Sequence, residues 1–239
     1  MKPIIAVSFQ TEDSEKAYSI RHRWIDYVEA IGAAAVMLVP ANNFSSTERV
    51  LSCASGVLIP GGNDVDPKMY GQKPLAGTDT PSPLRDKFES WLVKHCVSNN
   101  IPFLGICRGM QIANVALGGS LCQSIADRAG EHIEHWRLDD ATQPVHSIKL
   151  CEGGVLQKIF RTSTLEVNSV HHQSIDSVSA LLEVSAISQD GLIEALTCPK
   201  CNFFVGVQWH PEFNADAKFS AALGKAFMEA CLANTPFRV

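Results

Sequence analysis

The first half of the chain alternates short apolar runs with longer segments in which apolar side chains recur every three or four positions. Short apolar runs are typical of buried strands, and the three-to-four spacing is typical of helices. A repeated strand–helix–strand order predicts right-handed crossovers and a mainly parallel sheet. The expected strands are residues 3–8, 35–39, 56–59 and 102–106, and the expected helices are residues 20–32, 47–54, 83–99 and 108–117.

The second half predicts strands that follow one another closely. Asp190-Gly191 between two apolar runs indicates a hairpin, which joins antiparallel strands. No linker or repeat divides the chain, so we expect one α/β domain over residues 1–239. It should be a three-layer sandwich with a mainly parallel central sheet and extra antiparallel strands in the second half. These later strands are expected at residues 145–150, 166–169, 182–188, 192–197 and 204–209, before a last helix at about 215–233.

Composition excludes some partners and compartments. A net charge of −5 and a pI near 5.9, with 20 scattered Lys and Arg residues, argue against a nucleic-acid partner. The apolar stretch at the N-terminus is too short for a signal peptide, and no window is long enough for a membrane span. Eight cysteines in a chain that can bury a large core do not indicate a disulfide framework. We therefore expect a cytoplasmic protein with reduced thiols and no membrane association.

The most informative local pattern is Gly105-Ile106-Cys107-Arg108-Gly109, between an expected strand and an expected helix. Glycines on both sides allow a sharp turn that projects a reactive side chain, as in a nucleophile elbow. At a helix N-terminus, free N–H groups and the helix dipole favour the thiolate of Cys107. The N–H of Arg108 would face an oxyanion formed on a substrate carbonyl. The alternative is a buried structural cysteine.

A candidate base follows the last expected strand, in the order His210-Pro211-Glu212. Residues two apart in an extended segment face the same side, so the imidazole and the carboxylate can lie together. Glu212 would then fix the tautomer and charge of His210, which would act on the thiol. Taken alone, this tripeptide is more typical of a surface turn, and the cysteine turn reverses that preference.

A glycine turn, Gly61-Gly62, follows the strand expected at residues 56–59. Ligands of open parallel sheets bind where the strands end. The N–H of Gly62 could therefore approach a substrate carbonyl and complete an oxyanion hole with Arg108. The alternative is an ordinary tight turn, since this composition is turn chemistry in any case.

Together these motifs resemble those of a known family. GICRGMQ (105–111), VNSVHHQ (167–173) and GVQWHPE (206–212) resemble the class I glutamine amidotransferases, which carry a Cys-His-Glu triad on a flavodoxin-like sheet. PGGNDVDPKMYG (60–71), followed by RDKFE (85–89), is similar to the γ-glutamyl-γ-aminobutyrate hydrolase branch, peptidase family C26, of putrescine breakdown.

The resemblance implies a role for each matching position. His171 and His172 are weaker candidates for the base, because His210 already fills that role. The implied reaction forms a γ-glutamyl thioester and requires no metal or organic cofactor. By the family's pattern, Cys107 is the nucleophile, His210 the base and Glu212 its orienter, Gly62 and Arg108 are the oxyanion donors, and Gln111, Val170, His172 and Gln173 bind the γ-glutamyl group.

Two segments depart from the family's pattern. Cys198 and Cys201 form a C-x-x-C, which is half of a zinc site or a redox pair. Since a structural zinc site needs four ligands, His132 and His135 would have to supply the others; we favour a turn with incidental thiols. The second departure, residues 127–142, is acidic and contains histidines, and we expect it to line the outer substrate pocket.

The sequence therefore predicts a hydrolase of γ-glutamyl amines, with γ-glutamyl-γ-aminobutyrate as the favoured substrate and a small molecule as its partner. One alternative is a glutaminase component that delivers ammonia to a partner synthase. Another is a non-catalytic γ-glutamyl-binding protein on the same fold. The oligomeric state stays open, with a homodimer as one option.

Overall fold

The computed structural model of the chain describes residues 2–12, 16–40, 44–128 and 133–234. The largest sheet formed by these residues has nine strands in the order β4-β1-β5-β6-β13-β12-β11-β8-β9. The pairs from β4 to β13 are parallel, and those from β13 to β9 are antiparallel. The strands are β1 (Ile4–Ser8), β4 (Ala34–Leu38), β5 (Gly56–Ile59), β6 (Phe103–Ile106), β8 (His146–Leu150), β9 (Thr164–Val167), β11 (Glu183–Ser188), β12 (Ile193–Thr197) and β13 (Phe204–Val207).

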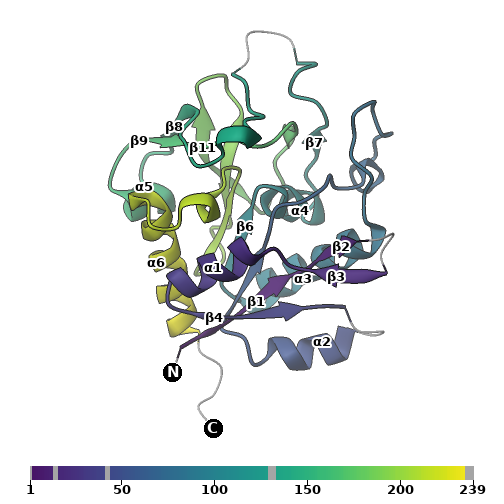
Figure 1. The fold of residues 1–239 in the computed structure, drawn as a ribbon, viewed down its shortest axis with the longest axis vertical. Helices are drawn as coiled ribbons and strands as arrows, with labels where there is room; N and C mark the ends of the chain where they lie inside the picture. Colours follow the sequence, from purple (N-terminus) through teal and green to yellow (C-terminus); the bar gives the residue numbers. More distant parts are fainter. Residues whose placement is uncertain (1, 13–15, 41–43, 129–132, 235–239) are drawn as a thin grey trace.

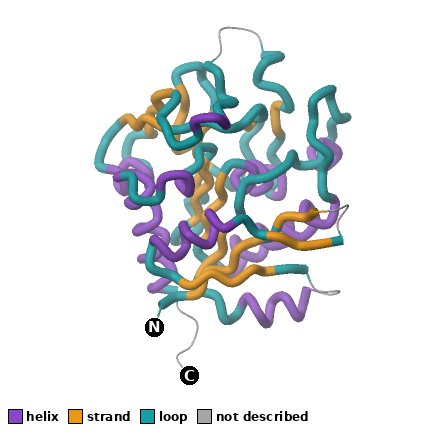
Figure 2. The backbone as a smooth tube through the Cα atoms, viewed as in Figure 1, coloured by secondary structure: helices purple, strands orange, loops and turns teal. Residues whose placement is uncertain are grey.

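Numbered along the chain, the five parallel strands have the order 2-1-3-4-5, which is the flavodoxin-like topology. Helices link these strands and cover both faces of the sheet, as Figures 1 and 2 show. The predicted fold class, a mainly parallel sheet with antiparallel strands added by the second half, is confirmed. The helices are α1 (His22–Ala30), α2 (Phe44–Leu51), α3 (Pro83–Asn99), α4 (Arg108–Ala116), α5 (Val155–Phe160) and α6 (Lys218–Ala233).

Two apolar clusters separate the three layers. Strand β1 supplies both, because successive side chains of a strand point to opposite faces. Its Ile5 packs into the cluster that contains Trp24 of α1 and Phe227 of α6. The next residue, Ala6, packs into the cluster that contains Phe88 of α3. The sheet is therefore buried on both faces, as expected for parallel strands joined by helices.

The structure also contains short elements that the sequence did not predict. Strands β2 (Gln10–Glu12) and β3 (Ala17–Ser19) pair with each other, as do β7 (Leu121–Cys122) and β10 (Ser174–Ile175). Helix α5 was not predicted either. Some predicted boundaries were wrong by two or three residues. The strand expected at 204–209 ends at Val207, where its pairing with β12 also ends.

The register of the sheet determines which chain segments meet at its edge. Ile106 at the end of β6 lies opposite Val207 at the end of β13. On the other side of β6, Ile59 at the end of β5 lies opposite Gly105. The residues that follow β5, β6 and β13 therefore leave the sheet side by side. These are the segments that carry the candidate oxyanion, nucleophile and base motifs.

Candidate active site

Cys107 is the residue between β6 and α4, and its backbone has a positive φ of 52° with ψ −108°, a conformation that residues other than glycine rarely adopt. The flanking glycines are required by close backbone contacts. A Cβ atom on Gly105 would lie 2.7 Å from the carbonyl group of Gly109, and one on Gly109 would lie 2.0 Å from the carbonyl oxygen of Ile59. The sharp turn predicted from the sequence is therefore present, and it holds Cys107 at the start of α4.

His210 and Glu212 contact each other as predicted, but for a different reason. The Nδ1 atom of His210 lies 2.7 Å from Oε1 of Glu212. The segment is not extended: residues Pro211–Asn214 form the 3₁₀ helix η3, with His210 just before it. Asn168, to which the sequence analysis gave no role, holds the backbone of His210. Its side chain accepts from the N–H of His210 at 2.8 Å and donates to the carbonyl of His210 at 2.8 Å.

The electrostatics of His210 suit a histidine that shares a site with a thiolate. Burial lowers the pKa of His210, but the negative charges of Glu212 and Cys107, and hydrogen bonding to both side chains, raise it to about 10. Since Nδ1 is bonded to Glu212, the free ring nitrogen Nε2 is the one available to the sulfur. The raised pKa of His210 favours its imidazolium form, and an adjacent cation stabilises a thiolate.

The sulfur of Cys107 also contacts the residue that follows β13 and the loop of residues 168–173. Gln208 donates a hydrogen bond from Nε2 to this sulfur over 3.4 Å, and the thiol lies 3.9 Å from the carbonyl oxygen of Val170. Gln111, one turn into α4, donates to the side-chain oxygen of Gln208 at 3.2 Å. The sequence analysis missed Gln208, although its place two residues before His210 was a usable signal.

A buried ion network supports the turn that carries Gly62. Arg85 on α3 bonds Glu89 at 2.8 Å and donates to the carbonyl of Pro60 at 2.9 Å. Glu89 also pairs with Arg108, which pairs in turn with Asp86. A Cβ atom on Gly62 would lie 2.2 Å from Nη1 of Arg85, so only glycine fits there. The RDKFE motif therefore holds the glycine turn against the start of α4.

Both candidate oxyanion donors adjoin this network, Arg108 through its own side chain and Gly62 through its contact with Arg85. Arg108 is the first residue of α4, so no carbonyl of its own helix can accept its N–H. Gly62 lines the same cavity as Cys107. A Cβ atom on the neighbouring Gly61 would lie 3.2 Å from Cε1 of His210 and 3.6 Å from Cβ of Cys107, so the turn packs against both side chains.

A cavity of about 190 Å³ brings most of the predicted site residues together. Gln173 is buried there, and neither polar atom of its side chain has a hydrogen-bond partner among the described residues. His172 bonds Asp64 at 2.8 Å, and this bond raises the pKa of His172. Arg23, which the sequence analysis missed, lies 3.9 Å from Glu212. The lining includes Gly62, Cys107, Gln111, Val170, His172, Gln173 and His210, whereas Arg108 and Glu212 lie behind it.

The two segments that departed from the family's pattern have different outcomes. Trp136 and Leu138, within residues 127–142, line the cavity. Cys198 and Cys201 belong to neither of the groups of three or more metal-ligating side chains found among the described residues. His132 lies outside the described residues. His135 contacts Ser169 and Asp190 instead.

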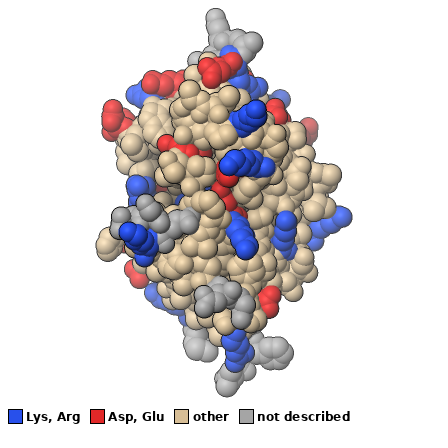
Figure 3. Space-filling view, turned by 90° about the vertical axis from the view of Figure 1, so that its right-hand side faces the viewer, with Lys and Arg blue, Asp and Glu red and all other residues tan. Residues whose placement is uncertain are grey.

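Two observations concern the surface and the helices. On the face that Figure 3 shows, acidic and basic side chains are interspersed. None of the helices in the described ranges combines the length and the apolar character that crossing a membrane requires.

Comparisons with known proteins agree with the fold and the motifs. A family model described as Peptidase C26 matches residues 3–212. Rv2859c of Mycobacterium tuberculosis, provisionally named a glutamine amidotransferase, is 41% identical over 211 residues. The matched residues are 86% of this chain and 66% of that protein, so this chain spans just under two thirds of its length. The γ-glutamyl-γ-aminobutyrate hydrolase PuuD of Escherichia coli K12 is 36% identical over 196 residues, which are 78% of this chain and 76% of PuuD.

A solved structure supports the fold alone. The glutaminase domain of Trypanosoma brucei CTPS with bound acivicin has a TM-score of 0.68 at 17% identity, with 100% of this chain and 96% of that chain covered. This likeness agrees with the flavodoxin-like order of the parallel strands.

Proposed function

The chain belongs to the peptidase C26 family, and on this premise we propose that it hydrolyses the γ-glutamyl amide bond of γ-glutamyl amines. One observation carries the proposal. Cys107 stands at a strained turn beside His210, and His210 is bonded to Glu212. Cys107 and His210 line one cavity, and Glu212 lies behind its wall. A cysteine, an imidazolium and an orienting carboxylate are the groups that acyl transfer through a thioester requires.

The proposed chemistry uses each group once in each half of the reaction. The Cys107 thiolate attacks the γ-carbonyl carbon, and the oxyanion accepts hydrogen bonds from the N–H groups of Gly62 and Arg108. The carbon–nitrogen bond breaks as His210 gives its proton to the leaving amine. His210 then takes a proton from water, and the hydroxide attacks the γ-glutamyl thioester. Glutamate leaves, and Cys107 returns to the thiolate.

The charges around the cavity support a γ-glutamyl group as the acyl part of the substrate. Such a group ends in an ammonium and a carboxylate. The cavity wall carries Arg21 and Arg23 as well as Asp64 and Asp79, so charges of both signs are available. The unpartnered side-chain amide of Gln173 can both donate and accept. The name of the E. coli relative makes γ-glutamyl-γ-aminobutyrate our first choice of substrate.

The test is a panel of amides incubated with the purified chain, with released amine measured. The panel contains γ-glutamyl-γ-aminobutyrate, other γ-glutamyl amines, γ-glutamyl dipeptides, glutamine and the α-glutamyl isomers. We expect release from γ-glutamyl amines and none from α-glutamyl isomers. Cys107→Ala is the matched control. It removes the sulfur while leaving the Gly105 and Gly109 contacts of the turn unchanged.

Two outcomes would contradict the proposal. Ammonia release from glutamine alone, without turnover of any γ-glutamyl amine, would favour the glutaminase alternative. Binding of γ-glutamyl amides without turnover, and with no labelling of Cys107 by a glutamine-like electrophile, would favour a non-catalytic binding protein.

A further inference from the structure

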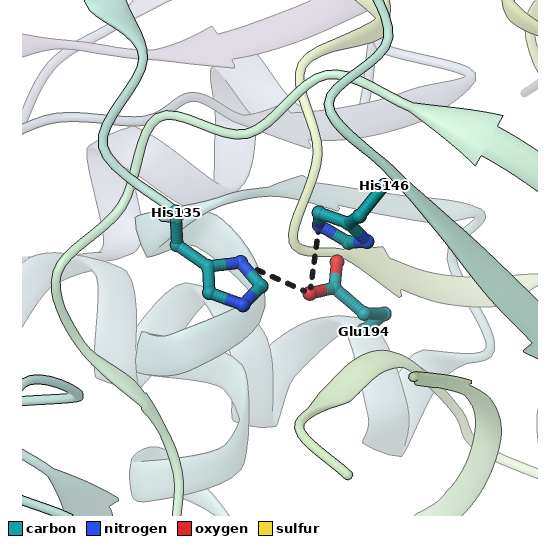
Figure 4. A group of neighbouring side chains, drawn as sticks. All are labelled: His135, His146 and Glu194. Atoms are coloured by element: carbon teal, nitrogen blue, oxygen red, sulfur yellow. Dashed lines mark ion pairs between the residues drawn. The ribbon is translucent and has the colours of Figure 1, made fainter. Parts of the chain in front are cut away.

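A second buried group of histidines surrounds a carboxylate outside the proposed catalytic triad. Glu194, on β12, has an exposed fraction of 0%. Its Oε1 atom lies 3.7 Å from Nε2 of His146 on β8 and 3.7 Å from Nε2 of His171. The Nδ1 atom of His135 lies 3.9 Å from the same oxygen. Figure 4 shows the rings of His135 and His146 both turned towards this one oxygen.

These separations are too long for hydrogen bonds, so the carboxylate has only long contacts to the three rings. Among the described residues, neither oxygen of Glu194 accepts a hydrogen bond, and Nε2 of His146 and of His171 is also unpartnered. A buried carboxylate without compensation costs several kcal/mol. Protonated rings or a bound cation can balance the charge of Glu194, and the orientation of the rings bears on which of the two does so.

In each ring one nitrogen faces Glu194 (the inner nitrogen) and the other faces away (the outer nitrogen). The hydrogen bond of the outer nitrogen determines whether the inner nitrogen carries a proton. Nδ1 of His171 lies 2.9 Å from the carbonyl oxygen of Gln173, which can only accept, so Nδ1 carries the proton. Nε2 of His135 lies 3.0 Å from a carboxylate oxygen of Asp190 and is a donor for the same reason. In a neutral imidazole the other nitrogen of His171 then has a free lone pair, whereas that of His135 meets the hydroxyl of Ser169 at 2.9 Å.

His146 follows the same pattern with a weaker contact. Its Nδ1 lies 3.5 Å from the carbonyl oxygen of Ser147, and its Nε2 faces Glu194. The inner nitrogens of His146 and His171 thus face the carboxylate without a partner of their own. Rings oriented by outer carbonyl groups, with the inner nitrogen free, are the arrangement found around metal-bound histidines.

We propose that Glu194, His146, His171 and His135 bind a zinc-type divalent cation in a closed, four-coordinate structural site. A tetrahedral zinc with bonds of about 2.1 Å separates its ligand atoms by about 3.4 Å. The three nitrogens lie 3.7–3.9 Å from Oε1 of Glu194, and the ligand atoms of Glu194, His135 and His146 lie within 4.8 Å of one another. Binding would draw the nitrogens together around the cation, with His171 moving inward and His135 exchanging its bond to Ser169 for the cation. Imidazole-rich ligand sets favour zinc and similar transition metals over magnesium or calcium. Together, Glu194 and Asp190 supply the two negative charges that balance a dication.

The position of the site indicates what the cation would do. His171 follows Val170, whose carbonyl faces the sulfur of Cys107, and the backbone N–H of Gln208 donates to the carbonyl of Glu194 at 2.8 Å. The cation would therefore tie the 168–173 loop to the antiparallel half of the sheet. Since all four ligands come from the protein, no coordination position is left for substrate. Its role is to hold the loop, independently of which amide the enzyme cleaves.

The test is a metal measurement on the full chain, which does not depend on activity. The protein is purified without chelator or affinity metal, loaded with Zn²⁺, freed of excess ion, and analysed by elemental mass spectrometry. We expect about one zinc per chain, as for a single closed site. Replacing zinc with Co²⁺ should give visible d–d absorption without thiolate-to-cobalt charge transfer. A charge-transfer band would locate the metal at cysteines such as Cys198 and Cys201 and would overturn the proposal.

Variants identify the ligands. Glu194→Gln and His146→Gln should each lower zinc retention at least about ten-fold, as expected for a lost ligand. His95→Gln, which alters a histidine of α3 outside the cluster, and Cys201→Ser should retain zinc. If Glu194→Gln does not fold, His146→Gln and the cobalt spectrum of the unmodified chain still decide the question. Less than about a tenth of an equivalent of zinc in the loaded wild type would overturn the proposal, as would undiminished zinc in both ligand variants.

Discussion

Two buried acid–histidine centres lie close together in this molecule, and they differ in how their carboxylates are satisfied. In the first centre, Glu212 and His210 are joined by a hydrogen bond of 2.7 Å, and the second ring nitrogen is left for Cys107. In the second centre, Glu194 has three imidazoles at 3.7–3.9 Å and no hydrogen bond to any of them. Similar residue types therefore produce two different local chemistries.

The difference shows that spacing, more than residue type, indicates the role of a buried carboxylate. A directly bonded carboxylate fixes a ring and stabilises its positive charge, which suits proton transfer to a leaving group. A carboxylate held about one ångström further away leaves a gap lined by lone pairs, which suits a cation. The predictions below test this distinction, beginning with the largest expected effect.

Removing the sulfur of the first centre should have the largest effect. We expect Cys107→Ala to lower kcat/KM for γ-glutamyl amides by roughly 10⁴-fold or more, because the nucleophile is lost. Thermal unfolding measured in parallel should change little, since the flanking glycines keep the turn. Zinc retention should stay at the wild-type level. Near-normal hydrolysis by this variant would rule out a thioester mechanism.

Removing the charge that orients His210 should have the next largest effect. We expect Glu212→Gln to lower kcat by roughly 10³- to 10⁴-fold, as for the orienting acid of other triads. Burial lowers the pKa of His210, and Glu212 is the first of the charges that raise it to about 10. In the wild type, His210 should therefore lose its proton only near pH 10. In the variant, the alkaline limb of kcat/KM against pH should move towards neutral pH.

The exposed Glu229→Gln on α6 is the matched control for this change. An alkaline limb that stays in place in Glu212→Gln would mean that Glu212 does not support the charge of His210.

Filling the glycine turn should have a smaller but distinct effect. Gly62→Ala places a methyl group against Arg85, which Glu89 and the carbonyl of Pro60 hold in place. Displacement of the turn should cost roughly 10²- to 10³-fold in kcat, which is typical for a lost oxyanion donor. Gly71→Ala is the control: with φ +77° it also carries the backbone strain of a non-glycine residue, but its Cβ atom meets open space, so the comparison isolates the contact with Arg85. Equal activity of the two variants would remove Gly62 from the oxyanion hole.

The smallest effect on hydrolysis is expected at the second centre. Asp190→Asn keeps the shape of the side chain that bonds His135 but removes its charge. We expect zinc affinity to fall roughly 10- to 100-fold, as for an outer partner of a metal-bound histidine, while hydrolysis changes by less than about three-fold. The exposed Asp216→Asn should leave zinc affinity unchanged. An Asp190→Asn protein with wild-type zinc affinity would count against the cation site.

Local motifs made the first centre predictable from the sequence. Gly105, Cys107 and Gly109 lie within one turn, and the glycines are there because neighbouring backbone leaves no space for a Cβ atom. His210 and Glu212 are two residues apart, so they could be paired even though the reason given, an extended backbone, was wrong. The family resemblance was confirmed, and it related these motifs to Gly62 and the 168–173 loop.

The second centre could not be predicted, because its members are joined only by tertiary structure. His146 and Glu194 lie on β8 and β12, which are separated in the sheet by β11. Their meeting depends on how the antiparallel strands are aligned with one another. The alternation of apolar and polar residues in short strands does not specify this alignment. Asn168 was missed for a related reason: its role consists of bonds to the backbone of His210, which lies 42 residues away. A side chain that supports a distant backbone leaves no pattern in its own neighbourhood.

The central place of β13 has a consequence for the newly made chain. This strand comes after all the others in the sequence, yet it lies between β6 and β12 in the middle of the sheet. The thiol of Cys107 and the amide of Gln208 are 101 residues apart along the chain. Until β13 inserts, Cys107 has neither His210 nor Gln208 beside it. A chain that lacks β13 therefore cannot assemble the proposed triad, and the site forms only when the last strand completes the sheet.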